Sequence, residues 1–115
     1  HGEPGVTRKK LGTVKDLVLF MMDKIFEDKK ISSGETVIVL INGMGGSTLM
    51  ELYSVYNEAN NYLGEKKILN VSPMIGSFST TQETSGFSIS LLIPDEQILN
   101  LWKANHEAPN FPKIM

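Results

Sequence analysis

Apolar residues recur at intervals of three and four near the start of the chain, which is the period of an amphipathic helix. Thr13, followed three residues later by Asp16, has the form of a helix N-cap with its reciprocal acid. The pattern therefore predicts a helix over Val14–Asp28. Its core face is Leu17, Val18, Met21, Ile25 and Phe26.

A strand–helix–strand unit is expected over residues 35–74. The β-branched run at 35–41 predicts a strand covered on both faces, and it ends in a glycine-rich turn from Asn42 to Gly46. Thr48 and Glu51 predict a helix to about residue 63, with Gly64 as its left-handed stop. A second strand at 68–74 would pair parallel to the first.

The remaining pattern predicts one more strand and a short helix. Residues 86–92 alternate apolar and serine side chains, which is typical of a half-buried antiparallel strand. Pro94 and Asp95 then start a helix. We expect its inner face to be Ile98, Leu99, Leu101 and Trp102. The fold class is therefore α/β, with a mixed, partly parallel sheet flanked by helices. Three strands make a thin sheet, so we expect the chain to be the later part of a longer polypeptide.

Composition narrows the possible functions. A net charge of −2 and a pI near 5.6 lack the excess positive charge that is typical of nucleic-acid-binding proteins. The chain has no cysteine, hence no disulfide or thiolate metal site, which fits a reducing cytoplasm. The longest apolar runs, 17–22 and 37–41, are too short to span a bilayer. No metal site is expected either, because no histidine stands at a ligand spacing from Glu51, Glu58 or Glu83.

Two stretches are candidates for chemistry. Backbone N–H groups in the turn from Asn42 to Gly46 would attract phosphate at a helix start, but the Gly-Lys-Ser/Thr ending and the G-x-G-x-x-G spacing are both missing. The alternative is that these glycines permit a sharp turn and close helix–strand packing. The opening loop, His1-Gly2-Glu3-Pro4-Gly5, disfavours regular structure and carries one imidazole and one carboxylate. His106 has no such context, and we expect it to be a surface residue.

The opening loop resembles a known signature. His1-Gly2-Glu3-Pro4-Gly5 is similar to Gly-Ile-His-Gly-Glu-Pro-Gly of the dihydroxyacetone kinase substrate-binding subunit family. Residues 40–46, 49–53, 55–57 and 85–92 resemble later blocks of that family, in the right order. The resemblance covers essentially the whole chain. It implies that residues 1–115 are the C-terminal portion of a two-domain subunit whose upstream domain is absent from this chain.

The resemblance implies a role for His1. In the family this histidine binds dihydroxyacetone covalently as a hemiaminal and presents it for phosphorylation to dihydroxyacetone phosphate. Gly2 and Glu3 are further candidates for substrate contact. The chemistry is reasonable, because a neutral imidazole is nucleophilic near pH 7 and glycerol has no carbonyl to attack.

The resemblance also implies partners. We expect no cofactor in this subunit, with nucleotide and Mg²⁺ on a separate kinase subunit recharged through a phosphotransferase system. We also expect a cytoplasmic homodimer that contacts neither nucleic acid nor membrane. Ser47-Thr48 stands where the family usually carries Thr-Pro. The alternative is therefore a non-catalytic paralogue that binds dihydroxyacetone and acts as coactivator of a transcriptional regulator.

Overall fold

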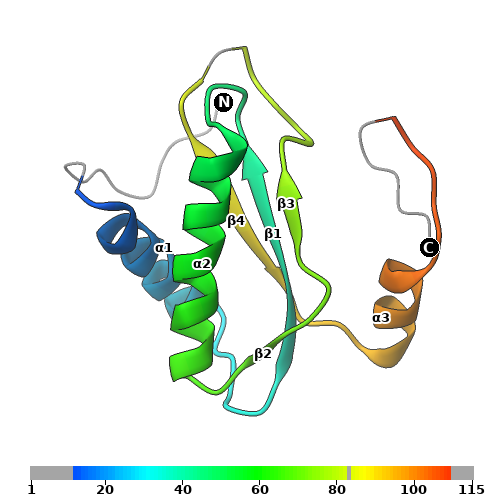
Figure 1. Ribbon diagram of the computed structural model, residues 1–115. Helices are drawn as coiled ribbons and strands as arrows, with labels where there is room; N and C mark the ends of the chain where they lie inside the picture. Colours follow the sequence, from blue (N-terminus) through cyan, green and yellow to red (C-terminus); the bar gives the residue numbers. More distant parts are fainter. Residues whose placement is uncertain (1–11, 83, 110–115) are drawn as a thin grey trace.

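Helices and strands alternate up to residue 70, and two further strands and a short helix follow (Figure 1). The computed structural model describes residues 12–82 and 84–109. Its elements, in chain order, are α1 (Val14–Asp28), β1 (Thr36–Gly43), α2 (Leu49–Glu65), β2 (Leu69–Asn70), β3 (Met74–Gly76), β4 (Phe87–Leu92) and α3 (Glu96–Lys103). No helix in the described part of the chain is long and apolar enough to cross a membrane.

Strand β1 is the centre of the sheet. It pairs parallel with β2, from Thr36 opposite Leu69, and parallel with β3, from Leu40 opposite Met74. Strand β4 runs antiparallel to β1. Both β3 and β4 pair with residues 40–42 of β1, so they lie on its opposite edges. The predicted mixed sheet and the parallel strand–helix–strand unit are confirmed.

The core lies between the sheet and the two long helices. Helices α1 and α2 pack against each other on one face of the sheet (Figure 1). Alternate residues of β1 point toward them, as the period of a strand requires. Burying each large apolar side chain here contributes about 1.5–3 kcal/mol relative to leaving it exposed. The fully buried members include Val18, Met22, Val37, Val39, Ile41, Leu52, Ala59 and Leu63.

The predicted helix starts are correct. The hydroxyl oxygen of Thr13 accepts a hydrogen bond from the Asp16 N–H at 3.1 Å, and Thr48 accepts from the Glu51 N–H at 3.2 Å. Each bond satisfies one of the N–H groups that a helix start leaves unpaired. Helix α1 has the predicted bounds because its cap and its apolar period agree.

The predicted left-handed stop at Gly64 is wrong. Helix α2 continues to Glu65, and the residue with positive φ is Lys67, at 58°. The Lys67 N–H donates to the Gly64 carbonyl, and the Ile68 N–H donates to the Leu63 carbonyl, both at 3.0 Å. These two bonds form a Schellman ending in which a lysine takes the place usually held by glycine.

The second predicted strand is broken into β2 and β3. Ser72 has φ of 48°, outside the extended region, and Pro73 lacks an N–H with which to continue the ladder. The proline therefore marks the interruption rather than the end of the strand.

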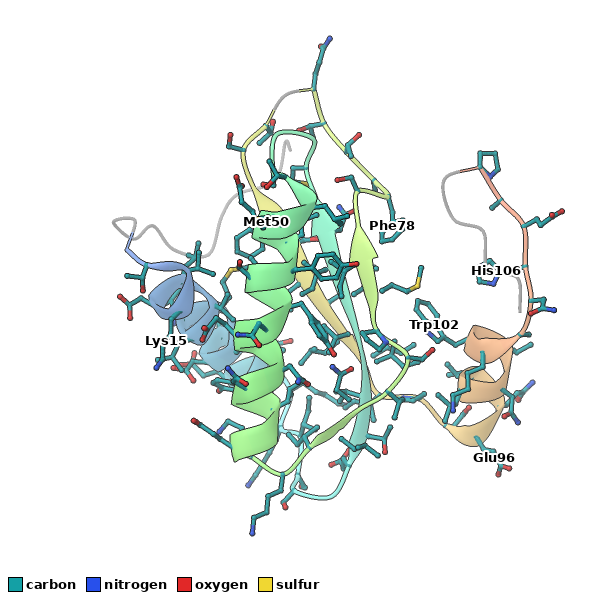
Figure 2. All side chains as sticks on the ribbon, in the orientation of Figure 1. Lys15, Met50, Phe78, Glu96, Trp102 and His106 are labelled. Atoms are coloured by element: carbon teal, nitrogen blue, oxygen red, sulfur yellow. The ribbon has the colours of Figure 1, made fainter. Side chains whose placement is uncertain are left out.

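The expected inner face of α3 forms only in part, because Leu99 and Trp102 are half-buried but Ile98 and Leu101 are exposed. All eight residues of this helix are described, and none is buried; Leu101 remains 67% exposed. Helix α3 stands apart beyond β3, on the side away from α1 and α2 (Figure 1). Its main link to the sheet region is Trp102, which points toward the strands (Figure 2) and donates from Nε1 to the Ser72 carbonyl at 2.9 Å.

Candidate functional site

The turn between β1 and α2 is joined to the loop that precedes β4 by one buried side chain. Asn42 is 6% exposed, at the end of β1. Its carboxamide oxygen accepts from the N–H groups of Phe78 and Ser79, at 2.8 and 3.0 Å. Its amide nitrogen donates to the Ser79 carbonyl at 2.7 Å. One side chain thus fixes the start of the 77–86 loop, with Phe78 beside the end of β3 (Figure 2).

Backbone hydrogen bonds join the same two segments further along. The Met44 N–H donates to the Gly86 carbonyl at 3.0 Å, and the Gly46 N–H donates to the Thr84 carbonyl at 2.9 Å. In return the Met44 carbonyl accepts from the Thr81 N–H at 3.0 Å. Two N–H groups that a phosphate cradle would need are therefore already bound to protein carbonyls.

The glycines of this turn are explained by packing. Gly45 has φ of 112°, which other residues rarely adopt. A Cβ on Gly46 would lie 2.9 Å from backbone atoms of Thr84 and Ser85. A Cβ on Gly43 would lie 2.9 Å from the Leu52 side chain of α2. The structural alternative for this turn, a sharp reversal with close helix–strand packing, is confirmed.

The candidate residues of the opening loop, His1, Gly2 and Glu3, lie outside the described residues, and so does Glu83. His106 was expected at the surface but is half-buried, with Nδ1 at 3.2 Å from the Ala104 carbonyl oxygen. Within the described ranges, no cluster of three histidine or acidic side chains could hold a metal ion.

Sequence reasoning did not identify the hydrogen bond between Tyr62 of α2 and Asp23 of α1. The Tyr62 hydroxyl donates to the Asp23 carboxylate at 2.6 Å. Burial, and then this hydrogen bond and the aspartate charge, raise the pKa of Tyr62 well above its ordinary value. Lys66 lies over the Tyr62 ring at 5.1 Å. The group joins the two helices and has no feature of a catalytic site.

A groove between the two long helices was also missed. It has a volume of about 480 Å³ and is lined mainly by apolar side chains of α1 and α2, with Phe87 of β4. Its polar members are Ser47, Glu51 and Ser85, which flank the turn and the loop described above. The sequence pattern assigns most of the lining residues to helices or strands, but it does not show the space between those elements.

Comparison with known proteins decides the family. The family model described as the Dak1 domain matches residues 1–110. The chain belongs to the Dak1 domain family. The resemblance stated from the sequence is confirmed. The Dak1 match begins at residue 1 and so includes the opening loop.

Relatives of this Dak1 chain have kinase names. It is 34% identical to the dihydroxyacetone-binding subunit DhaK of PTS-dependent dihydroxyacetone kinase 2 from Listeria innocua, over 96% of this chain and 34% of that protein. It is 28% identical to D-erythrulose kinase from Mycolicibacterium smegmatis, over 98% of this chain and 20% of that protein. The chain thus spans about a third of the subunit and a fifth of the larger kinase.

Solved structures agree with the fold. A structure titled "Regulation of the dha operon of Lactococcus lactis" matches with a TM-score of 0.80 and 27% identity, over 91% of this chain and 34% of the other. A dihydroxyacetone kinase operon co-activator, DhaQ, matches with a TM-score of 0.77 and 25% identity, over 90% of this chain and 33% of the other. The α/β architecture of this chain is therefore also found in two solved structures of dha operon proteins, one of which is named as a co-activator.

Proposed function

We propose that this chain carries the ketone-binding histidine of a DhaK-like subunit, and that His1 binds dihydroxyacetone covalently. The observation that carries the proposal is the sequence His1-Gly2-Glu3-Pro4-Gly5 at the start of a Dak1 match. Relatives named for dihydroxyacetone and for erythrulose support a short ketose as ligand.

The proposed reaction is the addition of an imidazole to a ketone. The lone pair of one ring nitrogen forms a bond to the carbonyl carbon, and the C=O π electrons move to the oxygen. The oxygen takes up a proton and the other ring nitrogen loses one, so the product is a neutral hemiaminal. Only ligands with a carbonyl can react, which separates a ketose from glycerol. The bond also holds the ketose in position for transfer of a phosphoryl group to its free hydroxyl.

The complete activity needs other parts. We propose that a partner subunit that binds nucleotide and Mg²⁺ phosphorylates the ligand to dihydroxyacetone phosphate. The Listeria relative is named as one subunit of a PTS-dependent dihydroxyacetone kinase, which supports a separate partner. Gly2 and Glu3 are proposed to contact or orient the bound ketose. Assembly as a homodimer and a cytoplasmic location, where the phosphoryl donors are, belong to the same proposal.

Native mass spectrometry of the full-length protein with dihydroxyacetone tests the binding step. A hemiaminal retains the whole mass of the ketone, whereas an imine with an amine loses one water. We expect the full-mass adduct in the parent protein and in His106→Ala, which removes the other histidine of residues 1–115. His1→Ala should abolish it. An adduct that survives His1→Ala, or no adduct at all, would refute the proposal.

A second function is supported by the likeness to the DhaQ co-activator. In that case His1 would bind dihydroxyacetone as a signal, and the liganded protein would act on a transcriptional regulator without turnover. Adding a nucleotide-binding kinase subunit to the liganded protein separates the two. Formation of dihydroxyacetone phosphate supports the kinase, and a stable adduct without product supports the sensor.

A further inference from the structure

The end of β1 carries a dipeptide, Asn42-Gly43, whose chemistry goes beyond its part in the turn. Asparagine is a thermolabile residue, because the nitrogen of the following peptide bond can attack its side-chain amide carbon. Glycine in the next position has no Cβ to obstruct this attack. Asn42 is the one asparagine of residues 1–115 that a glycine follows. The end of β1 is therefore the most reactive sequence of this chain toward spontaneous deamidation.

Packing and hydrogen bonding both require this reactive pair. A Cβ on Gly43 would lie 2.7 Å from the Ser77 Oγ and 2.9 Å from a methyl carbon of Leu52. The Asn42 carboxamide acts as an acceptor and as a donor toward residues 78–79. An aspartate would lack the donor, and a leucine would lack both groups. The fold thus places a labile dipeptide at a point where neither residue is easily replaced.

The folded conformation opposes the reaction at Asn42. The attack closes a five-membered ring, in which the Asn42 Cβ and the Gly43 nitrogen must lie nearly eclipsed about the Cα–C bond. Both residues belong to β1, and a strand has ψ of about +115 to +135°, which turns this nitrogen away from the Cβ. Three hydrogen bonds also hold the carboxamide, and Asn42 is only 6% exposed to water.

We propose that Asn42 is a latent deamidation site, which is closed in the folded chain and reacts when the backbone of residues 78–79 detaches from it. In the open state the Gly43 nitrogen forms a bond to the Asn42 Cγ, and the Cγ–Nδ2 bond breaks. The proton of the Gly43 N–H passes through solvent to the leaving group, which departs as ammonia. Water then adds to one of the two carbonyl carbons of the succinimide and breaks the bond from that carbon to nitrogen. Opening at Cγ gives aspartate, and opening at the main-chain carbon gives isoaspartate.

Both products change the attachment that Asn42 provides. The donor to the Ser79 carbonyl is lost in each of them. In isoaspartate the main chain also runs through Cβ, so one CH₂ is added to β1 between its pairings with Gly76 of β3 and Phe87 of β4. The ammonia is released, so the change is permanent. This chemistry does not involve His1 or its ligand, and it can hold or fail independently of the proposed function.

An exposed copy of the dipeptide provides a matched control in the same molecule. Ser33→Asn places asparagine before Gly34, in an exposed turn where described atoms leave open space around the glycine. The folded full-length variant is incubated at mildly alkaline pH. Mass spectrometry of its peptides follows both positions, because deamidation replaces NH₂ with OH, and an isoaspartyl methyltransferase labels the isoaspartate. We expect position 42 to react at least roughly tenfold more slowly than position 33, and both to react at similar rates in concentrated urea.

Hydrogen exchange connects the reaction to the opening. The Phe78 N–H donates to the Asn42 Oδ1 at 2.8 Å, so exchange of this amide needs the same detachment. Gly46→Ala leaves the dipeptide intact but strains the turn, since its Cβ would lie 2.9 Å from the backbone of residues 84–85. We expect it to raise the rate at position 42 by the same factor as the exchange rate of the Phe78 amide, and to leave position 33 unchanged. Low concentrations of urea vary the same opening in the parent protein if Gly46→Ala does not fold.

Three results would overturn the proposal. Equal rates at positions 33 and 42 in the folded chain would show that burial and hydrogen bonding give no protection. An Asn42 that stays intact in the unfolded chain would show that the dipeptide is not a site of deamidation. A rate at position 42 that stays constant while Phe78 exchange becomes faster would show that the reaction does not pass through this opening.

Discussion

Removing the Asn42 side chain should loosen the loop before β4 and lower the stability of the whole chain. In Asn42→Ala the Phe78 and Ser79 N–H groups lose their acceptor and the Ser79 carbonyl loses a donor. An unsatisfied buried group costs about 1–3 kcal/mol, and a satisfied hydrogen bond contributes about 1 kcal/mol net. Ser79 is exposed, so water replaces part of its loss. We therefore expect a destabilisation of about 2–3 kcal/mol.

Asn42→Asp separates the two halves of this interaction. The aspartate keeps an oxygen for both N–H groups but places a second oxygen against the Ser79 carbonyl at the former donor position. We expect the Phe78 N–H to stay protected from hydrogen exchange in Asn42→Asp and to exchange rapidly in Asn42→Ala. Asn57→Ala is the control, an exposed asparagine in the middle of α2, and should change stability by less than about 0.5 kcal/mol.

Urea unfolding followed by circular dichroism gives the free energies, and hydrogen exchange read at single amides gives the local effect. The reasoning is refuted if Asn42→Ala loses less than about 1 kcal/mol, the net value of a single hydrogen bond. It is also refuted if the Phe78 amide exchanges equally fast in the parent and in Asn42→Ala. Either result would mean that the backbone bonds of the turn hold the loop without the side chain.

Three further predictions use the same unfolding assay. Gly46→Ala should destabilise the chain by about 1–3 kcal/mol as an overpacked site, because its Cβ would meet backbone at 2.9 Å. Gly64→Ala should stabilise it by about 0.5–1 kcal/mol, since the described atoms leave open space there and the residue is helical. Tyr62→Phe tests the bond to Asp23. The pKa of Tyr62 is raised by folding, so its stabilising contribution is complete below the unfolded pKa and is lost as pH rises above about 10. The stability advantage of the parent over Tyr62→Phe should fall there by up to about 1.4 kcal/mol per pH unit.

For each of these three variants, one specific result would contradict the prediction. A neutral Gly46→Ala would show that the 84–85 backbone shifts freely, which its hydrogen bond to Gly46 argues against. A destabilising Gly64→Ala would mean that residue 64 contacts a part of the chain outside the described ranges. A parent-to-variant difference that stays constant from pH 8 to 11 would show that the Tyr62 hydroxyl is ordinary in the folded state.

Local signals predicted local structure well. The starts of α1 and α2 follow from a threonine and an acid three residues apart. The spacing of the apolar residues then predicts that the segments after these starts are helical. The predicted stop of α2 at Gly64 was wrong because the preference for glycine in the left-handed position after a helix is only a tendency. The two hydrogen bonds that close the helix fix Lys67 in the left-handed conformation regardless of its side chain. The prediction that α3 buries its whole apolar face was wrong for another reason. An amphipathic pattern does not show which surface, if any, packs against the apolar face of the helix.

The candidate site was predictable only in its parts. The glycines of the turn could be read as a phosphate cradle or as a packing device, and composition does not choose between them. The decision rests on the 84–86 backbone, which approaches from about forty residues away and uses the Met44 and Gly46 N–H groups. The role of Asn42 could not be predicted, since an asparagine at the end of a strand is ordinary until its three hydrogen bonds to Phe78 and Ser79 are seen.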